Sequence, residues 1–404
     1  MSFDFKPLKI GACIALAAAL TGGITGVAAA VFGRVLLAIG SFRDAHFIFL
    51  IPFLAPVGAL IAFLYKRFGK SSVKGMGLVF AAAENEDEDI PARLIPFVAI
   101  GTWLTHLFGG SAGREGVAVQ IGAAVGRLIR KLLPFENISR IMIVSGMAAG
   151  FSGLFRTPFA AVFFALEVLC AGCLEYRALV PACIAALTAY FVSGLCGLEK
   201  FVVPLGFTLS LDLPLIVKLV GLGIIFGLVG AAFAFALERS KELVGAKFKN
   251  PVTRIAIIGL ALSVLLVLLH KGRYSGLGTN LINLSFSGGT LFAYDWLLKL
   301  ALTVLTLCAG FQGGEVTPLF SIGASLGVAL APIFGVPVEL AAALGYAAVF
   351  GGASNTLLAP IFIGAEVFGY QYLPMFCIVC IAAYACNLNL SIYSGQKLLN
   401  DRRN

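Results

Sequence analysis

The stretch GGSAGREGVAVQIGAAVGR, residues 109–127, places a charged pair inside a chain that is otherwise strongly apolar. Glycines crowd its first half and an uncharged run fills its second half, so we expect a chain break and then a helix that begins near Arg114 and Glu115. A helix start inside a membrane leaves amide N–H groups without acceptors and carries about half a positive charge, which attracts anions. The location of this break therefore decides both the fold and the chemistry.

The composition is that of an integral membrane protein. Of the 404 residues, 60% are hydrophobic and only 12% are charged, and the mean hydropathy is +0.99. Such a chain cannot hide its apolar surface behind a water-facing shell, and its long uncharged runs predict helices rather than the short alternating segments of a β-barrel. Candidate spans cover residues 11–33, 47–65, 178–198, 219–237 and 367–396, and the last of these has room for two elements.

The net charge of +9 is gathered in clusters that we expect to face the cytoplasm, so its basicity predicts topology and no nucleic-acid partner. The first apolar run is too long for a signal peptide, which indicates a retained helix. The acidic run at 84–89 contains no basic residue, and we expect a solvated loop on the outer face. The basic clusters are Lys66, Arg67, Lys70 and Lys74; Arg127, Arg130, Lys131 and Arg140; and Arg239, Lys241, Lys247, Lys249 and Arg254.

Nine cysteines lie almost entirely in apolar runs. Cys170 with Cys173, and Cys377 with Cys380, have CxxC spacing, but neither pair has clear His or Cys partners nearby. We expect small packing residues in membrane helices, and therefore no metal site and no cofactor.

Several helical segments are too short to cross a bilayer, namely 116–126, 141–155 and 157–166. Helices that end inside a membrane are tolerated only where protein or water surrounds the break, as in a permeation pathway. Further glycine-rich breaks precede helix starts at 75–77, 150–158 and 310–318. Several such ends that converge would bind an anion without a fixed counter-cation.

An internal repeat relates the two halves of the chain. GMAAGFSGLFRTPFAAVFFALEV at 146–168 aligns with GYAAVFGGASNTLLAPIFIGAEV at 345–367 with a shift of 199, and IGAAVG at 121–126 aligns with IGASLG at 322–327 with a shift of 201. We place the two membrane repeats at residues 1–240 and 241–404, without a separate soluble domain. An odd number of crossings in each half would invert the repeats, and transporter halves of this kind form a site at their interface.

Each ionisable residue in a membrane segment has a functional and a structural interpretation. Glu115 either competes with an anion and carries a proton, or caps its helix and pairs with Arg114. Glu315 at the break of the second half is either functional or a first-turn acid that favours the helix dipole. Thr317 offers a hydroxyl donor but is also an ordinary cap before Pro318.

Glu167 and Glu366 occupy repeat-equivalent positions, and this symmetry favours a structural role, such as accepting hydrogen bonds from amides of a neighbouring break. We expect Lys299 to snorkel to an interface and His106 to be a satisfied packing residue. A remote alternative is an intramembrane serine hydrolase that uses Ser111, because 109–113 and 323–327 fit G-x-S-x-G. That pattern lacks its strand context here.

The ordered set of motifs resembles the CLC family of anion channels and anion/proton antiporters over nearly the whole chain. GREG followed by VAVQIGAAVGR resembles the family's GREGP and VQIG; GMG at 75–77 falls at its GSGIP loop, GEVTP at 314–318 at its GxFxP, and Tyr393 at its late anion-binding tyrosine. The resemblance implies an all-α fold of two inverted repeats with many tilted, broken and re-entrant helices. It also implies a homodimer with one pore in each subunit and both termini in the cytoplasm.

The resemblance also implies roles for individual residues. Glu115 matches the gating glutamate, which alternately blocks the anion path and carries a proton, whereas we interpret Arg114 as structural or field-shaping near the pore mouth. The hydroxyl of Tyr393 matches one that faces the central anion, and Phe80 is a candidate through its electropositive ring edge. The complete implied anion-binding set is Met76, Gly77, Phe80, Gly116, Glu315, Val316, Thr317 and Tyr393.

Departures from the usual pattern resemble the CLC-F branch of bacterial fluoride/proton antiporters. Met76 replaces the serine of GSGIP, Val117 the proline of GREGP, and Val316 the phenylalanine of GxFxP. Val168 stands where chloride antiporters have their inner proton-transfer glutamate, so a chloride-type inner proton route is missing. Thr317 and Glu315 add polar groups that would replace water around fluoride.

We therefore expect a transporter, not an enzyme, in the lipid bilayer of the inner (plasma) membrane, where it exports fluoride in exchange for protons and confers fluoride resistance. A chloride/proton antiporter or a passive CLC anion channel is the alternative.

Overall fold

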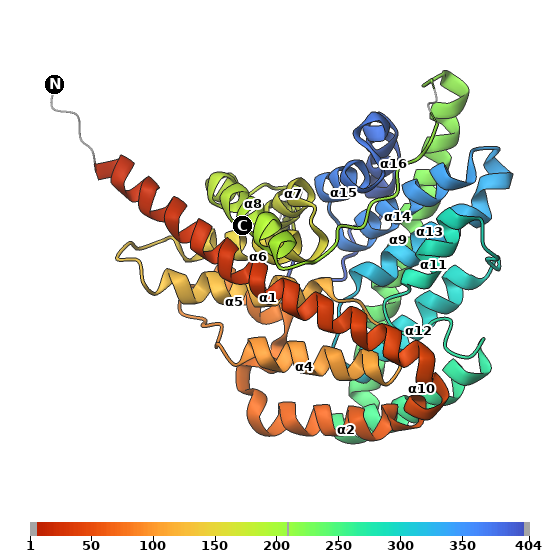
Figure 1. Cartoon of the computed structure of the whole chain (residues 1–404), viewed down its shortest axis with the longest axis horizontal. Helices are drawn as coiled ribbons and strands as arrows, with labels where there is room; N and C mark the ends of the chain where they lie inside the picture. The colour runs from red at the N-terminus through yellow and green to blue at the C-terminus, as the bar shows by residue number, and fades with distance from the viewer. Residues whose placement is uncertain (1–5, 208–209, 400–404) are drawn as a thin grey trace.

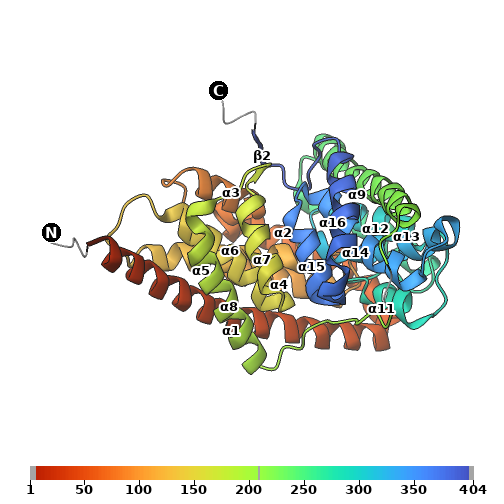
Figure 2. The same ribbon diagram turned by 90° about the horizontal axis from the view of Figure 1, so that it is seen from above.

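The computed structural model describes residues 6–207 and 210–399, most of them helical (Figures 1 and 2). The α-helices of the first half are α1 (Lys6–Leu50), α2 (Leu54–Leu64), α3 (Met76–Glu84), α4 (Leu94–Leu107), α5 (Glu115–Arg130), α6 (Ser139–Phe155), α7 (Pro158–Glu167) and α8 (Leu179–Leu195). Those that follow are α9 (Leu213–Lys247), α10 (Pro251–Leu268), α11 (Thr279–Ser287), α12 (Asp295–Ala309), α13 (Val316–Phe334), α14 (Val338–Ser354), α15 (Leu358–Phe368) and α16 (Leu373–Ala385). The short elements are η1 (Ile51–Phe53), η2 (Tyr65–Gly69), η3 (Lys70–Lys74), η4 (Tyr176–Ala178), η5 (Tyr370–Tyr372), β1 (Cys170–Ala171) and β2 (Lys397–Leu398).

The described residues contain 5 helical stretches long and apolar enough to cross a membrane, which include α9, α10 and α13. Other apolar helices, among them α6, α7 and α15, have only 10 to 17 residues. A helix rises about 1.5 Å per residue, so these short helices stop within a bilayer about 30 Å thick. The expected mixture of full spans and broken helices is confirmed.

The first helix differs from the sequence-based interpretation. α1 runs for 45 residues through Leu50, with one non-helical residue at His46, and the chain then reverses through η1 into α2. The prediction of a single span at 47–65 is wrong because the short turn divides this apolar run. Pro52 lies in the first turn of η1, where a residue without an amide N–H is tolerated. Figure 1 shows α1 lying along α4, α5, α6 and α8.

The same close helix pair is built once in each half. A Cβ added to Gly122 of α5 would lie 2.0 Å from the carbonyl oxygen of Gly146 in α6, and one added to Gly323 of α13 would lie 2.0 Å from that of Gly345 in α14. Only glycine allows backbones to approach this closely. The four glycines are equivalent in the internal repeat, so the repeat marks a packing unit. The proposed boundary at residue 240 falls inside α9, and this division stays a prediction.

The side chains of two glutamates form hydrogen bonds between the two halves of the chain. The carboxylate of Glu167 at the end of α7 accepts hydrogen bonds from the amides of Leu357 (3.1 Å), Leu358 (3.1 Å) and Ala359 (2.8 Å) at the start of α15. Glu366 of α15 does the same for Phe159 (3.3 Å) and Ala160 (2.9 Å) at the start of α7. The expected hydrogen bonds from amides of a neighbouring break are confirmed for both glutamates. Each supplies acceptors that a membrane interior lacks, so a structural role stays the prediction.

The acidic run at 84–89 lies beside the basic clusters. Glu88 pairs with Lys74 (2.7 Å), Asp89 with Lys131 (2.9 Å), and Glu84 with Arg140 (2.9 Å). Burial raises the pKa of Asp89, but Lys131 and Arg127 outweigh this effect and lower it overall. The expectation that this run faces the side opposite the basic clusters is wrong, because its carboxylates serve as their counter-ions. We call the side that bears these clusters and Lys241 the basic side.

Two adjacent glycines of α1 give a direct test of this packing. A Cβ at Gly22 would lie 2.4 Å from the carbonyl oxygen of Ala185 in α8, whereas a Cβ at Gly23 meets nothing within 4 Å. We expect Gly22→Ala to lower the free energy of unfolding by about 1–3 kcal/mol through overpacking, and Gly23→Ala to leave it unchanged or slightly raised. Thermal unfolding of both variants in detergent measures the difference. Equal stabilities would contradict the contact between α1 and α8.

Candidate ion-binding site

The breaks before α5 and α13 are bonded to each other. The amide of Gly113 donates to the carbonyl of Gly314 (2.5 Å), and the amide of Gly314 donates back to that of Gly113 (2.8 Å). A Cβ at Gly113 would lie 2.6 Å from Glu115 Oε2 and 2.8 Å from Pro318, so this crossing requires glycine. The bridge holds two helix N-termini, one from each half of the chain, against one another. The residues that precede the two helices, Arg114 and Glu315, do not cap them through their own side chains.

Glu115 fills the space between these helix starts. It is fully buried, and its Oε2 accepts hydrogen bonds from the amides of Thr317 (2.9 Å) and Arg114 (3.0 Å). Its Oε1 contacts the hydroxyl of Thr317. A carboxylate on the amides of a helix start occupies the position that a mobile anion would take. Glu115 thus stands as an internal anion in the site.

A cavity of about 210 Å³ opens at the start of α5, where Gly116 lines it, toward the basic side, where Lys74 and Lys241 line it. The uncapped start of α3 also points here, because Gly75, Met76 and Gly77 form part of the wall. Six residues of the predicted anion-binding set line this cavity, namely Met76, Gly77, Phe80, Gly116, Glu315 and Tyr393. The other two, Val316 and Thr317, form the first turn of α13.

Aromatic rings form one wall of the cavity. Phe80 and Tyr393 stack with centroids 5.7 Å apart and an interplanar angle of 28°. A Cβ at Gly395 would lie 2.9 Å from that of Phe80, so this glycine lets the final loop approach α3. Glu315 is half-buried in the same wall, and its Oε2 would lie 3.8 Å from a Cβ at Gly116. A second carboxylate therefore stands within reach of the start of α5.

Gln120 also lines the cavity, and reasoning from the sequence did not select it. Its side chain is 7% exposed, and its Oε1 accepts no hydrogen bond from the described residues. The signal was a single amide side chain within the apolar run VAVQIGAAVG. Gln312, Ser394 and Lys241 were missed as well, because no local pattern distinguishes them.

The predictions for two other polar residues near the break, His106 and Lys299, differ in how they compare with the structure. His106 is buried, as expected of a packing residue, and its ring nitrogens lie 2.8 Å from the carbonyl of Thr102 and 2.9 Å from that of Ala112. A neutral ring donates a hydrogen bond to only one of these two carbonyls. Lys299 does not snorkel: it is fully buried, and its Nζ donates to Ser111 Oγ (2.9 Å) and two backbone carbonyls. That expectation is wrong because the break at 109–113 and the segment at 274–276 supply acceptors deep inside the protein.

The geometry does not favour a serine hydrolase. Ser111 is fully buried, and its hydroxyl contacts Thr303 Oγ1 (2.9 Å) as well as Lys299. His106 bonds backbone carbonyls instead of this serine. Ser325, the serine of the second pattern, donates to the carbonyl of Ser321 in its own helix (2.7 Å). Ser111 has Lys299 as a neighbour, but it is fully buried, which leaves no room for a substrate beside its hydroxyl. Among the described residues, the partners of Ser325 are carbonyls of its own helix, which cannot act as a base.

Arg114 lies at the same helix start without acting as a partner for the carboxylate of Glu115 through its side chain. Its guanidinium carbon lies 5.8 Å from the ring centroid of Phe155. Its Nε and Nη1 have no hydrogen-bond acceptor among the described residues. A fixed positive charge beside the site fits the expected field-shaping role, which stays a prediction.

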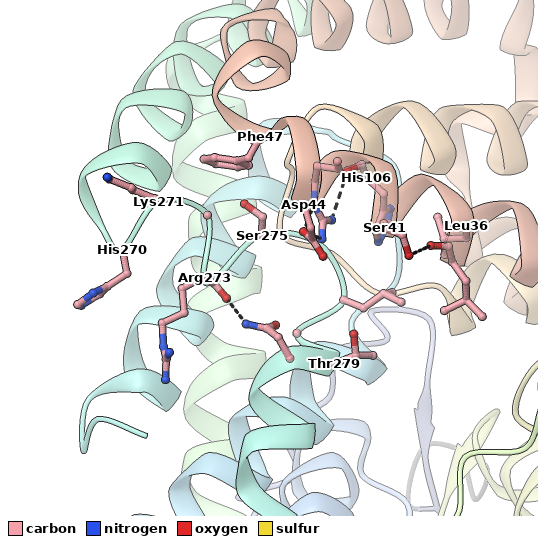
Figure 3. Close-up of a pocket in the computed structure, with 17 residues that line it drawn as sticks. Leu36, Ser41, Asp44, Phe47, His106, His270, Lys271, Arg273, Ser275 and Thr279 are labelled. Atoms are coloured by element: carbon pink, nitrogen blue, oxygen red, sulfur yellow. Dashed lines mark hydrogen bonds and ion pairs between the residues drawn. The ribbon is translucent and has the colours of Figure 1, made fainter. Parts of the chain in front are cut away.

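A second pocket, of about 440 Å³, lies at the other end of the break (Figure 3). It is lined by the end of α1, His106 and the segment at 270–280. The amide of Gly276 donates to the carbonyl of Gly110 (2.9 Å), and the amide of Ala112 donates to the carbonyl of Gly276 (3.3 Å). Because α10 separates this segment from the basic loop at 248–250, the two pockets open toward opposite ends of a membrane-crossing helix.

Broken apolar helices with helix starts gathered around a buried carboxylate define a membrane transport protein, and comparison with known proteins identifies the family. A family profile described as "Voltage gated chloride channel" matches residues 57–388. The chain belongs to this family, the CLC family, and is a multi-pass membrane protein with the CLC fold. The expected all-α fold and the resemblance to the CLC family are confirmed.

Three individual proteins are similar to this chain over most of its length. A "Chloride/fluoride channel protein" from Pseudomonas syringae pv. tomato is 36% identical over 390 residues, which cover 94% of this chain and 85% of the relative. A solved structure described as a CLC-type fluoride/proton antiporter is 52% identical, with a TM-score of 0.95, 98% of this chain covered and 100% of that one. A slow cyanobacterial Cl⁻/H⁺ antiporter shares the fold, with 21% identity, a TM-score of 0.79 and coverage of 93% and 94%.

Proposed function

We propose that this protein is a fluoride/proton antiporter that exports fluoride. The observation that carries the proposal is the carboxylate of Glu115 seated on the amide of Thr317 and the start of α13. The position is built for a small anion, and the group that occupies it accepts a proton. The 52% identical structure described as a CLC-type fluoride/proton antiporter and the 36% identical chloride/fluoride channel protein support the choice of ion.

The exchange follows from competition between two anions for one set of donors. An ionised Glu115 holds the amides of Arg114 and Thr317, which excludes fluoride. A protonated carboxyl accepts these hydrogen bonds more weakly, so protonation releases the side chain and opens the site. Fluoride then enters as the proton moves with the carboxyl. Because the bound anion and the seated carboxylate exclude each other, movement of one ion is coupled to movement of the other.

The wall of the inner cavity suits a small, strongly hydrated anion. Thr317 offers a hydroxyl and an amide at the helix start, and Glu315 offers a donor when it is protonated. Met76 at the start of α3 presents no hydroxyl, so this position lacks a donor for a larger halide. We assign Met76, Gly77, Phe80, Gly116, Glu315, Val316, Thr317 and Tyr393 to the anion path, with Glu315 as the partner of Glu115 in proton transfer.

Efflux from proteoliposomes tests this function. Vesicles loaded with fluoride or with chloride are diluted into buffer without that ion, and ion-selective electrodes follow the anion while a pH electrode follows protons. We expect fluoride efflux with proton uptake and little chloride efflux. Chloride-preferring flux would instead support a chloride/proton antiporter, and anion flux without protons would support a passive channel. Rescue of a fluoride-sensitive bacterium by this gene tests the role in resistance.

We propose that the basic side faces the cytoplasm of a cell whose inner membrane holds the protein, with both chain ends on that side. The basic residues near the junction of α9 and α10 support this orientation, and Lys397 near the chain end pairs with Glu84 (2.5 Å) on the same side. We expect an impermeant maleimide to label Lys271→Cys but not Lys247→Cys in intact cells, and the reverse in inverted vesicles. Both positions are exposed, so the pair is matched; the opposite pattern would overturn the orientation.

We propose that two copies assemble as a homodimer, each with its own site. The resemblance to CLC proteins and the broad apolar outer faces support the assembly, for example on α8, where Val180 is 65% and Phe191 62% exposed. Single-molecule photobleaching of protein carrying one dye per chain, at high lipid dilution, should show two bleaching steps. A majority of single steps at every dilution would contradict a stable dimer.

A further inference from the structure

The pocket of about 440 Å³ at the end of the break remote from the basic side has no part in the exchange described above (Figure 3). It lies between the end of α1 and the segment at 270–280, at the end of α10 opposite Lys241. Ser275, Asp44 and Thr279 surround it, while His270 and Arg273 turn their side chains away. We call it the outer pocket.

The outer pocket contains free hydrogen-bond donors. α11 begins here at Thr279 after Gly278, whose φ of +85° belongs to the left-handed region, and no side chain caps this start. Gly278, Thr279 and Asn280 all line the pocket. Ser275 is only 3% exposed, and its Oγ has no partner among the described residues. An uncapped helix start and an unpartnered hydroxyl in one pocket form a set of donors for an anion.

The side chain of Lys299 lies beneath these donors. Its Nζ bonds Ser111 Oγ (2.9 Å) and the carbonyls of Tyr274 (3.0 Å) and Gly276 (2.7 Å), and it has no acidic partner among the residues that the structure describes. These hydrogen bonds fix the amine deep in the protein. The stem of the side chain reaches the wall of the pocket, since a Cβ at Gly278 would lie 2.7 Å from Lys299 Cε.

The charges at the pocket are largely balanced. The buried guanidinium of Arg43 pairs with Asp44 at 2.7 Å, and the side chain of Asp44 is 68% exposed. Arg273 pairs with the buried Asp295 at 2.7 Å. Among the described residues at the rim, Asp44 opposes a bound anion, whereas the exposed Lys271 attracts one.

We propose that the outer pocket is a binding site for the transported anion, held by Ser275 and the start of α11. The site adjoins the gate, because Gly276 bonds to Gly110 and Ala112 of the break that leads to Glu115. An anion bound in the outer pocket is held close to the gate, so the site favours entry of the anion from the outer side and has no effect on entry from the basic side. This inference rests on the proposed fluoride/proton exchange and adds a place where fluoride is held on the outer side of the gate.

Transport measured separately from each side tests the site. Right-side-out and inverted membrane vesicles of defined orientation take up fluoride at graded concentrations, which gives a KM for the outer and for the inner face. We expect Ser275→Ala to raise the outer KM by about tenfold to a hundredfold, the range for loss of one hydrogen bond to an ion. The inner KM and kcat should stay unchanged. Ser285→Ala is the matched control, because its buried hydroxyl donates to the carbonyl of Leu281 within α11.

A second variant, Asp44→Asn, is expected to change the outer KM in the opposite direction. Asp44→Asn removes the opposing charge and releases Arg43, so we expect the outer KM to fall while the inner KM stays the same. An outer KM unchanged in both Ser275→Ala and Asp44→Asn, or equal changes on both faces, would overturn the site while leaving fluoride/proton exchange intact. Absence of fluoride uptake by the unchanged protein would overturn the proposed function and, with it, the identity of the bound anion.

Discussion

Replacement of Glu115 by Gln is expected to abolish proton movement coupled to fluoride. The amide is nearly isosteric, so α5 and α13 should keep their positions, but it binds no proton at physiological pH. Its oxygen accepts hydrogen bonds from the amides of Arg114 and Thr317 less strongly than the carboxylate does. Proton uptake measured during fluoride efflux should fall by at least about a hundredfold, because the carrier group itself is lost.

The control for this variant is Glu242→Gln, which changes an exposed carboxylate of α9 that pairs only with Arg239. It should transport both ions as the unchanged protein does. Thermal unfolding of Glu115→Gln confirms that the fold is retained. Proton uptake at an undiminished rate would remove Glu115 from the proton path and leave it as a cap of its helix.

Replacement of Glu167 by Ala is expected to be the most destabilising single change considered for the fold. Three amides at the start of α15 lose their acceptor together, at a position where Glu167 is buried. Each hydrogen bond to a charged group contributes about 1.5–3 kcal/mol, so the loss exceeds about 3 kcal/mol. We expect little folded protein in detergent extracts, measured by size-exclusion chromatography with a fluorescent tag.

Glu167→Gln should recover part of the folded fraction, because its amide oxygen remains an acceptor. Glu199→Ala is a control outside this network. Because Glu366 supplies the equivalent contact to Phe159 and Ala160, Glu366→Ala should act in the same direction by a smaller amount. A folded fraction of Glu167→Ala equal to that of the control would contradict the role of this bond in joining the two halves.

The local signals in the sequence were sufficient for the centre of the site. Glycine clusters followed by uncharged runs marked the starts of α3, α5 and α13, and the repeat offset related the pair α5 and α6 to α13 and α14. The equivalence of Glu167 and Glu366 indicated a shared structural role. These features are visible because helix breaks and close helix contacts impose residue types directly on the chain.

Features set by distant partners were not predictable in this way. Lys299 donates a hydrogen bond to Ser111, which lies 188 residues away in the sequence. The apolar residues that flank Lys299 in the sequence do not reveal this partner, and on their basis alone we expected its side chain to reach the membrane interface. The acidic run at 84–89 has no basic residue within it, yet its partners Arg127, Lys131 and Arg140 lie in other segments. Only the folded arrangement reveals which charges are counter-ions and that Lys299 bonds neutral groups instead of an acidic residue among the described part of the chain.

The central claim is that fluoride and a proton compete through Glu115 and therefore move in exchange. Proteoliposomes loaded with fluoride, with the membrane voltage clamped by potassium and valinomycin and the lumen made more acidic than the bath, test it most directly. We expect the outward fluoride gradient to drive protons into the vesicles against their own gradient, and Glu115→Gln to lose this uphill movement. Fluoride efflux without uphill proton movement would contradict the account.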